Sequence, residues 1–360
     1  MARASVGARL HFGFCNLSLS HERLYGALGV GLAAPRVVVD AEPDSAVGVT
    51  VEAAAGAESS GSASAVREDV REYATAATDL LGVDGARVAV RESLPRHAGL
   101  GSGTRLAAAT LAAVATAHGE PVRVRERAPS LGRGGRSGVG VATFESGGFV
   151  LDAGHPTARF TIDRPADGEW TVPPVAARHA VPDDWRFLLV DPDADAGRSG
   201  AAEDDAMRTA VERAEPGIAD RIGGIVTRRV LPSIATGNAE AFGAAVAEIG
   251  RLNGAWYADE QGGVYRPPVG EIVASLSEAS AVFGAGQSSW GPTVYGVTDA
   301  DHADAAAEAG ERALDAAGVG GSVSVVRATN EGARIADEGG ADPRSTDSER
   351  GNTKPRGDGA

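Results

Sequence analysis

A glycine-rich turn between an alternating segment and an almost purely apolar one constrains this chain more than any other stretch. Residues 86–92 roughly alternate apolar and polar side chains, which predicts a strand. Residues 104–117 are almost only Ala, Leu, Val and Thr, which predicts a buried helix. Between them, Gly99, Gly101 and Gly103 let the backbone turn sharply and approach a ligand closely. The chain is therefore expected to run from strand through tight turn to helix here.

This turn is a candidate phosphate-binding site. The free N–H groups and the dipole at a helix start both favour a negatively charged oxygen. Ser102 and Thr104 add hydroxyl groups, and Arg96 and Arg105 add positive charge nearby. The glycine spacing matches neither the P-loop, which ends in Gly-Lys-Ser/Thr, nor the dinucleotide-binding pattern. A tight turn without a ligand is the alternative interpretation.

Length and composition narrow the class of protein. The 360 residues give room for two domains and a sizeable core. No apolar run of about eighteen residues is present, so no transmembrane helix is expected. The first ten residues lack the apolar segment of a signal peptide, and the single cysteine, Cys15, cannot form an internal disulfide. We therefore expect a cytoplasmic protein with no membrane partner, and leave a homodimer open.

The charge balance points away from nucleic acid. The formal net charge is −15, and nearly all positive charge is arginine, because Lys354 is the one lysine. An acidic surface repels nucleic acid and suggests a salt-loving or GC-rich source. Arginines in glycine-rich loops stand out against this background as candidate ligand-binding groups.

Predicted strands and helices occur in separate runs, which is typical of an α+β fold. Strands are expected at 3–14, 23–31, 36–40, 47–53, 86–92, 148–152, 186–191, 281–285, 293–297 and 322–328. Helices are expected at 66–81, 104–117, 203–215, 218–231, 239–251, 269–278 and 301–316, with 139–145 undecided. Residues 165–181, rich in Pro, Ala and charge, read as a linker. We expect one domain over 1–175, a second over 182–328, and a disordered tail over 329–360.

Three glycine-rich segments resemble the motifs of the GHMP kinase superfamily. Pro95 to Thr104 resembles its phosphate motif, a proline followed by Gly-Leu-Gly-Ser. Residues 9–16 sit where that superfamily carries an N-terminal substrate motif, and residues 284–286 resemble its C-terminal glycine-rich motif. The resemblance covers about residues 3 to 328. It implies an N-terminal domain like ribosomal protein S5 domain 2, a ferredoxin-like C-terminal domain and a site between them.

Within the superfamily, the chain most resembles the β-ribofuranosylaminobenzene 5′-phosphate synthases. The resemblance is carried by residues 9–13 (Arg-Leu-His-Phe-Gly), 23–26 (Arg-Leu-Tyr-Gly), 95–104 and above all 132–141, Gly-Arg-Gly-Gly-Arg-Ser-Gly-Val-Gly-Val. It implies an archaeal enzyme of methanopterin biosynthesis. Phosphoribosyl pyrophosphate would lose pyrophosphate, and a ring carbon of 4-hydroxy- or 4-aminobenzoate would be ribosylated with loss of carbon dioxide. The sequence leaves the choice of benzoate open.

Site roles follow from this implied reaction. Backbone N–H groups near Gly101 would hold pyrophosphate with Mg²⁺, whose protein ligands the sequence does not identify. Arg133 and Arg136 would grip the benzoate carboxylate in bidentate fashion. The expected catalytic residues are Arg133, Arg136, His11 and His97. The expected phosphate- or substrate-binding residues are Arg9, Arg23, Gly99, Gly101, Ser102, Gly103, Thr104, Ser137, Gly284, Gly286, Gln287 and Ser288.

Each assignment has a structural alternative. The arginines could be ordinary surface or strand-end charges, the histidines structural hydrogen-bonding groups, and residues 284–288 only a hairpin turn. Asp191 and Glu203 are weaker candidates for holding the metal ion.

One departure from the kinases concerns the catalytic base. Many of them carry an Asp shortly after a Ser-Gly pair, whereas here Ser137-Gly138-Val139 is followed by Gly140. Phosphoryl transfer to an alcohol uses such a carboxylate, and a ribosyl transfer to carbon does not need it. An ATP-dependent small-molecule kinase is the first alternative function. A catalytically inactive protein that binds a phosphorylated metabolite is the second.

Overall fold

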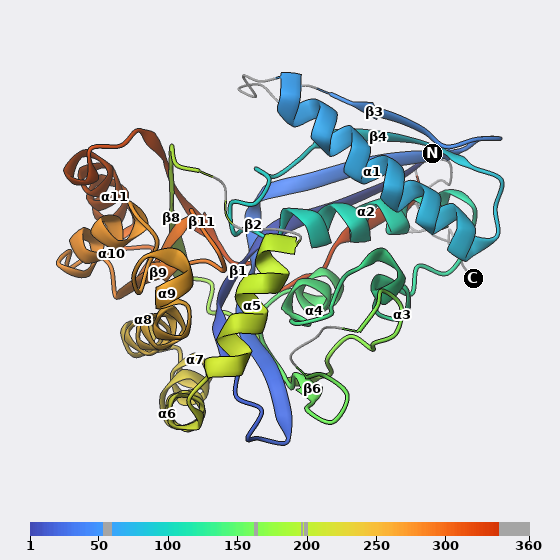
Figure 1. Ribbon diagram of the computed structural model, residues 1–360. Coiled ribbons are helices and arrows are strands. Elements are labelled where there is room, and N and C mark those ends of the chain that lie inside the picture. Colours follow the sequence, from blue (N-terminus) through green and yellow to red (C-terminus); the bar gives the residue numbers. More distant parts are fainter. Residues whose placement is uncertain (53–59, 162–164, 196, 198–200, 338–360) are drawn as a thin grey trace, which may run out of the picture.

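The computed structural model describes residues 1–52, 60–161, 165–195, 197 and 201–337, which form two α+β lobes side by side (Figure 1). The N-terminal lobe is built on an eight-stranded sheet whose main path runs β12-β1-β2-β4-β3, with β5 and β6 pairing with β2, and β7 with β5. Its strands are β1 Ala2–Asn16, β2 Arg23–Pro43, β3 Gly48–Val51, β4 Ala86–Glu92, β5 Phe149–Asp152, β6 His155–Pro156, β7 Val175–His179 and β12 Arg334–Asp337. Its helices are α1 Ser60–Leu81, α2 Ser102–Ala117, α3 Val124–Arg127, the 3₁₀ turn Ala128–Leu131 and α4 Val139–Ser146.

Helix α2 is the central helix of the N-terminal lobe. It packs against β1 and β2 on one side and against α1 on the other. Eleven consecutive residues, 105–115, are buried, which explains why the helix is apolar on every face. The predicted strand at 86–92 and the predicted helix after the glycine-rich turn are both confirmed.

The longest strand is β2, for which the sequence pattern predicted two separate strands, 23–31 and 36–40. It pairs with β1 from Asn16↔Tyr25 to Ala2↔Ala41, and the register shifts at two places. Between Gly7↔Arg36 and Arg9↔Gly31 the extra residues are on β2 and include Pro35, so β2 continues past the proline and the ladder resumes beyond it. Between His11↔Gly29 and Gly13↔Leu28 the extra residue is on β1. The resulting β1–β2 hairpin extends beyond the sheet toward the bottom of Figure 1.

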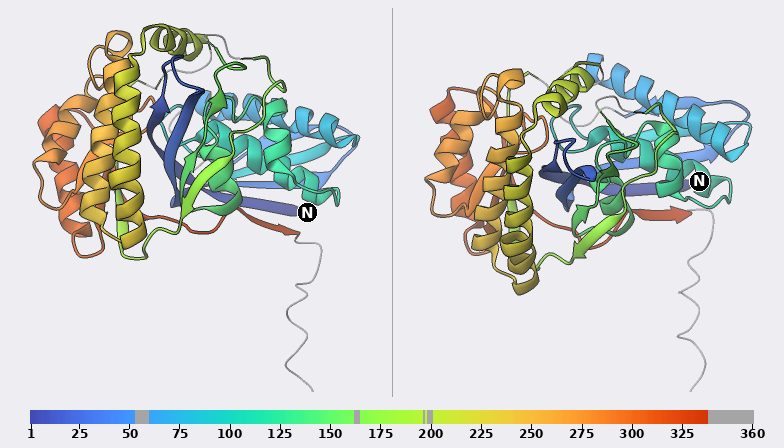
Figure 2. Two further views of the ribbon diagram at one scale, coloured as in Figure 1. Left: turned by 90° about the horizontal axis from the view of Figure 1, so that it is seen from below. Right: turned by 60° about the horizontal axis from the view of Figure 1, so that its bottom comes forward.

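The C-terminal lobe contains a four-stranded antiparallel sheet in the order β11-β8-β10-β9. Its strands are β8 Trp185–Pro192, β9 Gly284–Gln287, β10 Val294–Asp299 and β11 Gly321–Arg327. Its helices are α5 Ala201–Arg213, α6 Pro216–Ile225, α7 Leu231–Thr236, α8 Ala239–Trp256, α9 Ala258–Gln261, α10 Val269–Ser277 and α11 Ala303–Ala317, with the π-helical turn Val226–Val230 between α6 and α7. Helices α8, α10 and α11 contact this sheet and gather on one side of the molecule (Figure 2). No described helix is both long and apolar enough to cross a membrane.

Helix α5 lies at the front of the molecule, between the two lobes (Figure 1). Its buried side chains Met207, Ala210 and Val211 belong to one apolar cluster with residues of the β1–β2 hairpin and with Tyr257. This packing holds the first turn of α5 close to the ends of β1 and β2.

Two expectations about the chain's organisation need correction, and one open question is answered. Residues 175–179, placed in a linker, form β7, which pairs with β5, so the N-terminal sheet extends beyond the expected boundary at 175. Residues 139–145, left undecided, lie in helix α4. Residues 329–337, placed in the disordered tail, lie within the fold, because Thr329 bonds to Gly31 and β12 pairs with β1. Strand β12 is exposed along its length and shows no alternating pattern. The rest of the predicted tail, 338–360, lies outside the described residues.

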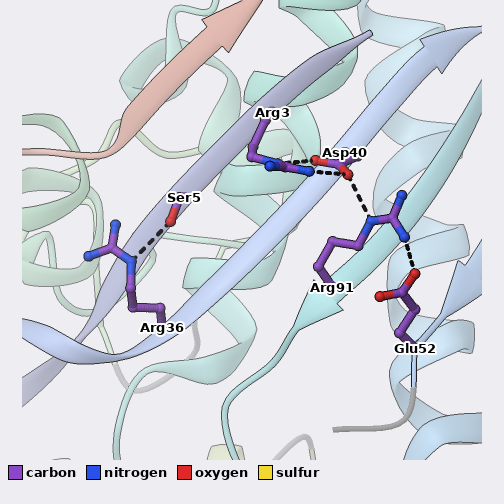
Figure 3. A network of polar contacts seen from close by, with 6 residues as sticks. All are labelled: Arg3, Ser5, Arg36, Asp40, Glu52 and Arg91. Carbon is purple, nitrogen blue, oxygen red and sulfur yellow. Dashed lines mark hydrogen bonds and ion pairs between the residues drawn. The ribbon is translucent and has the colours of Figure 1, made fainter. Parts of the chain in front are cut away.

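An ionic network ties the neighbouring strands β1, β2 and β4 together (Figure 3). Asp40 on β2 is 2% exposed and accepts hydrogen bonds from Arg3 Nε at 2.7 Å and from Arg91 Nε at 2.8 Å. Arg91 on β4 also pairs with Glu52. The hydrogen bond from Arg3 on β1 is the largest of the effects that hold the pKa of Asp40 below its usual value. Asp40 is thus a buried carboxylate whose charge is matched from both neighbouring strands.

We expect Asp40→Asn to reduce the free energy of unfolding by about 1.5–3 kcal/mol, the usual contribution of hydrogen bonds to a charged group. Because the folded-state pKa is lowered, the contribution is present above the unfolded-state value, about 3.9. It is lost as the pH falls through the lower folded-state pKa. Urea unfolding should therefore show a gap between native and variant that is constant near neutral pH and shrinks below about pH 4.

The control for this prediction is Glu42→Gln, which removes an exposed partner of Arg87 on the same strands. Exposed pairs contribute little, so this variant should unfold within about 0.5 kcal/mol of the native protein. Equal losses in both variants would contradict the assignment of Asp40 as the centre of the network.

Candidate active site

The glycine-rich turn forms an open cradle at the start of α2, with a geometry that suits an anion. Gly99 and Gly101 have φ angles of 92° and 81°, which lie in the left-handed region that favours glycine. Gly101 is the N-cap residue and has no side chain to cap the first turn. The N–H groups of Ser102, Gly103 and Thr104 are therefore left for an anion, and the helix dipole favours negative charge there. All of these residues line one cleft, of about 610 Å³.

Two arginines flank the cradle, and glycine is what lets them approach. Arg9 on β1 donates a hydrogen bond from Nη1 to the carbonyl oxygen of Gly99 at 2.5 Å. A Cβ on Gly101 would lie 3.0 Å from Arg9 Cγ. A Cβ on Gly103 would lie 3.0 Å from Nη1 of Arg133. Both guanidinium groups thus reach the turn only because these positions carry no side chain.

The flanking arginines are partly withdrawn from solvent. Burial lowers the pKa of Arg9 to about 10, against the opposing influence of Glu203, so Arg9 stays positive at neutral pH. Arg133 hydrogen-bonds to the hydroxyl of Tyr73, and its guanidinium carbon lies 5.2 Å from the centre of that ring. Arg96 also lines the cleft and is paired with Asp69 at 2.9 Å. The cleft therefore combines three cations with the free start of a helix.

Arg105 does not line the cleft. It is 1% exposed and donates hydrogen bonds to the carbonyl oxygen of Gly140 at 2.6 Å and to Thr143 Oγ1 at 2.7 Å. The side chain joins α2 to α4, and burial and Arg9 lower its pKa to about 9, so it is a positive charge beside the cradle that does not reach into the cleft.

Ser288 joins the cradle to the C-terminal lobe. Its side chain is fully buried; the hydroxyl donates to the carbonyl oxygen of Gly99 at 2.7 Å and accepts from the backbone N–H of His11 at 3.1 Å. A Cβ on Gly99 would fall 2.1 Å from the carbonyl oxygen of Ser288. Three segments that are far apart in the sequence, and that the sequence analysis aligned with family motifs, therefore meet at one point.

The other glycines of the C-terminal motif have a packing role. Residues 284–287 form strand β9 and not a loop or hairpin turn. A Cβ on Gly284 would lie 2.1 Å from the carbonyl oxygen of Gly243 on α8, and one on Gly286 would lie 2.7 Å from the hydroxyl of Tyr295. Neither glycine lines the cleft, so the structure explains both by close packing and places no phosphate near them.

Arg136 and Ser137 do not line the cleft. Arg136 pairs with Glu203 at 3.2 Å and with Asp204, both on the first turn of α5. Ser137 Oγ accepts from the N–H of Val139 at 3.2 Å at the start of α4. Arg133 lines the cleft and Arg136 does not, but both oppose the burial that raises the pKa of the Glu203 carboxylate, which lines the cleft and is bound by Arg136.

Arg23 is also remote from the cleft. It lies near the hairpin end of β2 and donates to the carbonyl oxygens of Ala153 at 2.5 Å and Gly154 at 2.7 Å. These bonds give Arg23 a structural role in holding the turn after β5. His97, by contrast, lines the cleft, and burial together with Arg96 lowers its pKa.

A second, smaller pocket opens beside the cleft. It is lined by His11, Gln287 and several aromatic side chains, and it shares Ser289 and Trp290 with the cleft. His11 is 4% exposed, and burial and Arg9 lower its pKa to about 3. Those expected site residues that line a cavity are thus divided between two adjoining ones.

The position of the missing kinase carboxylate has a steric explanation. A Cβ on Gly140 would lie 2.9 Å from the methyl carbon of Thr104, so α4 packs tightly against the cradle there. Glu145, further along α4, is bound by Arg125 at 2.7 Å. Asp152 accepts the N–H groups of Gly138 and Gly154 and is buried. No carboxylate on α4 or β5 lines the cleft.

The structure adds cleft residues that sequence reasoning did not place there. Glu203, considered only as a surface acid or metal ligand, lines the cleft, and burial raises its pKa against the influence of Arg136. Asp69, Glu72 and Tyr73 reach the cleft from α1. Their spacing of three and four residues puts them on one helical face, a signal that the predicted helix contained. Which surface that face would meet is set by tertiary packing.

The fold and the site define the class of the protein. A family model described as GHMP kinases N terminal domain matches residues 63–148, and one described as GHMP kinases C terminal matches residues 230–316. Solved structures of similar fold include homoserine kinase from Cytophaga hutchinsonii (17% identity, 93% of this chain, 97% of that one, TM-score 0.61). Phosphomevalonate kinase from Streptococcus pneumoniae is another (11% identity, 91% of this chain, 99% of that one, TM-score 0.62). The expected two-domain GHMP-kinase-like fold is confirmed.

Curated relatives narrow the class. A protein named beta-ribofuranosylphenol 5'-phosphate synthase from Methanothermobacter thermautotrophicus is 35% identical over 298 residues, 81% of this chain and 87% of the relative. A protein of the same name from Archaeoglobus fulgidus is 28% identical, over 84% of this chain and 89% of the relative. The chain belongs to the family of these synthases, transferase-type enzymes on a GHMP kinase scaffold, as its motifs predicted.

The structure predicts that Arg133, which lines the cleft, and Arg23, which does not, differ in their effect on phosphate binding. Arg133→Ala should weaken binding of inorganic pyrophosphate about tenfold or more, because a hydrogen bond to a charged group contributes roughly 1.5–3 kcal/mol. Arg23→Ala should leave the affinity unchanged, since Arg23 holds backbone carbonyls elsewhere. Isothermal titration calorimetry with pyrophosphate measures both, with circular dichroism as the check on folding. Equal affinities for native protein and Arg133→Ala would show that the cradle is placed wrongly.

Proposed function

We propose that this protein transfers the phosphoribosyl group of phosphoribosyl pyrophosphate to a 4-substituted benzoate with loss of carbon dioxide. The product would be a β-ribofuranosyl arene 5′-phosphate, an intermediate of a methanopterin-type cofactor. The observation that carries the proposal is an arginine-flanked phosphate cradle beside a position, Gly140, where a kinase base has no room. The names of the curated relatives support the same reaction.

The bond changes balance without an external base. The bond between the anomeric carbon and pyrophosphate breaks, and pyrophosphate leaves with the electron pair. The ring carbon that carries the carboxylate forms the new bond to the anomeric carbon. The bond from that ring carbon to the carboxylate then breaks, its electron pair restores the aromatic ring, and carbon dioxide departs. No alcohol proton has to be removed, which fits the absence of a carboxylate from α4 in the cleft lining.

The residues of the cradle would act on the leaving group. The N–H groups of Ser102, Gly103 and Thr104 would bind pyrophosphate oxygens, and Arg9 and Arg133 would neutralise the charge that develops as the bond breaks. His97, half-buried at the same edge, would add a neutral hydrogen-bonding group at physiological pH. These groups are already fixed by packing, so little reorganisation accompanies the step.

The cleft also fits a magnesium ion that enters with the donor. Mg²⁺ bound to phosphates usually takes one or two carboxylates and keeps several waters. Asp69 and Glu72, three residues apart on α1, and the hydroxyl of Ser102 line the cleft and supply oxygen ligands. No cluster of three or more His, Cys, Asp or Glu residues occurs within the described part of the chain. Asp69 and Glu72 would therefore hold the ion only together with the donor, where it would neutralise phosphate charge.

The choice of acceptor follows from the relatives. Their printed name specifies a phenol product, which corresponds to 4-hydroxybenzoate and not to 4-aminobenzoate. We therefore propose 4-hydroxybenzoate as the acceptor. A cytoplasmic location, a homodimer and an acidic, salt-adapted surface stay predictions from the sequence.

The rival functions remain distinguishable. A GHMP-type kinase would use the same cradle for ATP, and Glu203 is a carboxylate in the cleft, although Arg136 and the Trp290 side chain bind it. An inactive binding protein would keep the cradle without turnover.

The deciding experiment incubates the pure protein with Mg²⁺, phosphoribosyl pyrophosphate and carboxyl-labelled 4-hydroxy- or 4-aminobenzoate. We expect labelled carbon dioxide and pyrophosphate in equal amounts, more from the hydroxy compound, and no ATP consumption. ATP turnover that depends on added small alcohols would replace the proposal with the kinase function. Donor binding without turnover of either benzoate would replace it with the binding-protein function.

A further inference from the structure

The small pocket beside the cleft differs from it in chemistry. Its walls include the rings of Phe14, Tyr257, Tyr265 and Trp290. None of the described residues that line it is Arg, Lys, Asp or Glu. It meets the charged cleft at Ser289 and Trp290, which line both cavities. A neutral aromatic compartment thus opens directly into the phosphate-binding one.

The walls of the pocket are fixed by contacts between the lobes. Asn253 on α8 accepts the N–H of Phe14 at 2.7 Å and donates to the carbonyl oxygen of the same residue at 2.9 Å. The ring of Tyr257 packs against that of Trp290, with centroids 4.7 Å apart. The pocket is therefore formed by packed elements of β1, α8 and the segment after β9.

His11 supplies a polar group whose hydrogen bonding is incomplete. Its Nδ1 is buried and has no partner among the described residues, although the backbone of His11 is fully engaged with Ser288 and Ser289. The ring packs edge-on against Phe14 at 5.0 Å. With its pKa lowered to about 3 by burial and Arg9, the imidazole is neutral at physiological pH. A buried neutral imidazole nitrogen without a partner can accept a hydrogen bond from a ligand in the tautomer that leaves it unprotonated.

We propose that this pocket takes the para end of the aromatic acceptor, with the para hydroxyl hydrogen-bonded to His11 and the carboxylate-bearing carbon at the mouth, in the cleft. The inference rests on the proposed function. It moves the acceptor away from Arg133 and Arg136, because Arg136 is bound by Glu203 and Asp204 and does not line the cleft.

Three observations fix the orientation of the ring. A carboxylate inside the pocket would be buried without a cation, which costs much free energy. The carbon that loses carbon dioxide has to meet the donor, and the cradle is in the cleft. The pocket volume is about 40 Å³, room for about three waters at roughly 10–15 Å³ each, so one end of the ring enters and the other stays outside. The first two place the para substituent innermost, and the third limits how much of the ring enters.

The hydrogen bond to His11 has a chemical consequence. When the ring carbon forms its new bond, positive charge spreads to the para oxygen, which makes its proton more acidic. A neutral nitrogen that accepts this hydrogen bond stabilises that charge, and the proton stays with or returns to the oxygen once carbon dioxide leaves. His11 would thus be both a binding residue and the source of selectivity for a para hydroxyl.

Gly250 provides a direct test, because it leaves the pocket open. A Cβ there would lie 3.5 Å from the hydroxyl of Tyr295 and 3.8 Å from that of Tyr265, ordinary contact distances, so the first carbon of a side chain fits without moving backbone. Gly250→Val should fill the pocket and raise the Michaelis constant for 4-hydroxybenzoate about tenfold or more, as expected for a blocked apolar subsite. The constant for phosphoribosyl pyrophosphate should not change.

The matched control is Gly223→Val on α6, where a Cβ has no neighbour within 4 Å. It makes the same change in a helix away from both cavities and should alter neither constant. A second variant, His11→Phe, keeps a ring of similar shape and removes the hydrogen bond. Calorimetry should then show that the ratio of the affinities for 4-hydroxybenzoate and for unsubstituted benzoate falls toward one.

The outcomes separate the inference from the proposed function. If the native protein turns over 4-hydroxybenzoate and Gly250→Val leaves the Michaelis constant for 4-hydroxybenzoate unchanged, the pocket assignment is overturned and the proposed function stands. If no benzoate is turned over, the function fails, and calorimetric binding of 4-hydroxybenzoate decides the inference. Binding that Gly250→Val abolishes supports an arene site here, whereas equal binding, or none by the native protein, overturns it.

Discussion

The buried hydroxyl of Ser288 is the contact on which the arrangement of the site depends. It donates to the carbonyl oxygen of Gly99 in the cradle and accepts from the N–H of His11 on β1. The backbone of Ser289 adds a hydrogen bond to His11. Gly99 must be glycine for this contact, because any Cβ would overlap the carbonyl oxygen of Ser288. The phosphate-binding turn, the first strand and the C-terminal lobe are therefore held in fixed relation, and both cavities form at their junction.

The two cavities at this junction differ in charge. The cleft holds Arg9, Arg96 and Arg133 at the start of a helix, which suits a donor with several phosphates. The adjoining pocket is neutral and aromatic, which suits one end of a ring. In a reaction between a phosphorylated sugar and an arene, the two reacting carbons have to come within bonding distance. The two environments therefore have to adjoin. The shared wall at Ser289 and Trp290 is where the proposed reaction would occur.

Sequence reasoning succeeded where local pattern and local structure coincide. The strand at 86–92, the buried helix α2 and the cradle between them follow from alternation, apolar content and glycine spacing. It failed where contacts between distant segments determine the role of a residue. Gly284 and Gly286 have no room for a side chain because atoms of a helix and of a tyrosine ring lie close to them. In the sequence, a glycine required by such packing cannot be told from a glycine required by a bound ligand. Arg9 and Arg23 both lie on the first hairpin, yet only Arg9 meets the cradle. Strand β12 is exposed at all four residues, so burial imposes no apolar pattern on its sequence.

The most direct test of the account is a crystal structure of the protein with Mg²⁺, pyrophosphate and 4-hydroxybenzoate bound. We expect pyrophosphate at the N-terminus of α2 in contact with Arg133, the ring beneath Trp290, and the para oxygen within hydrogen-bond distance of His11. A benzoate carboxylate that displaces Glu203 from Arg136, with the aromatic pocket left empty, would contradict the account.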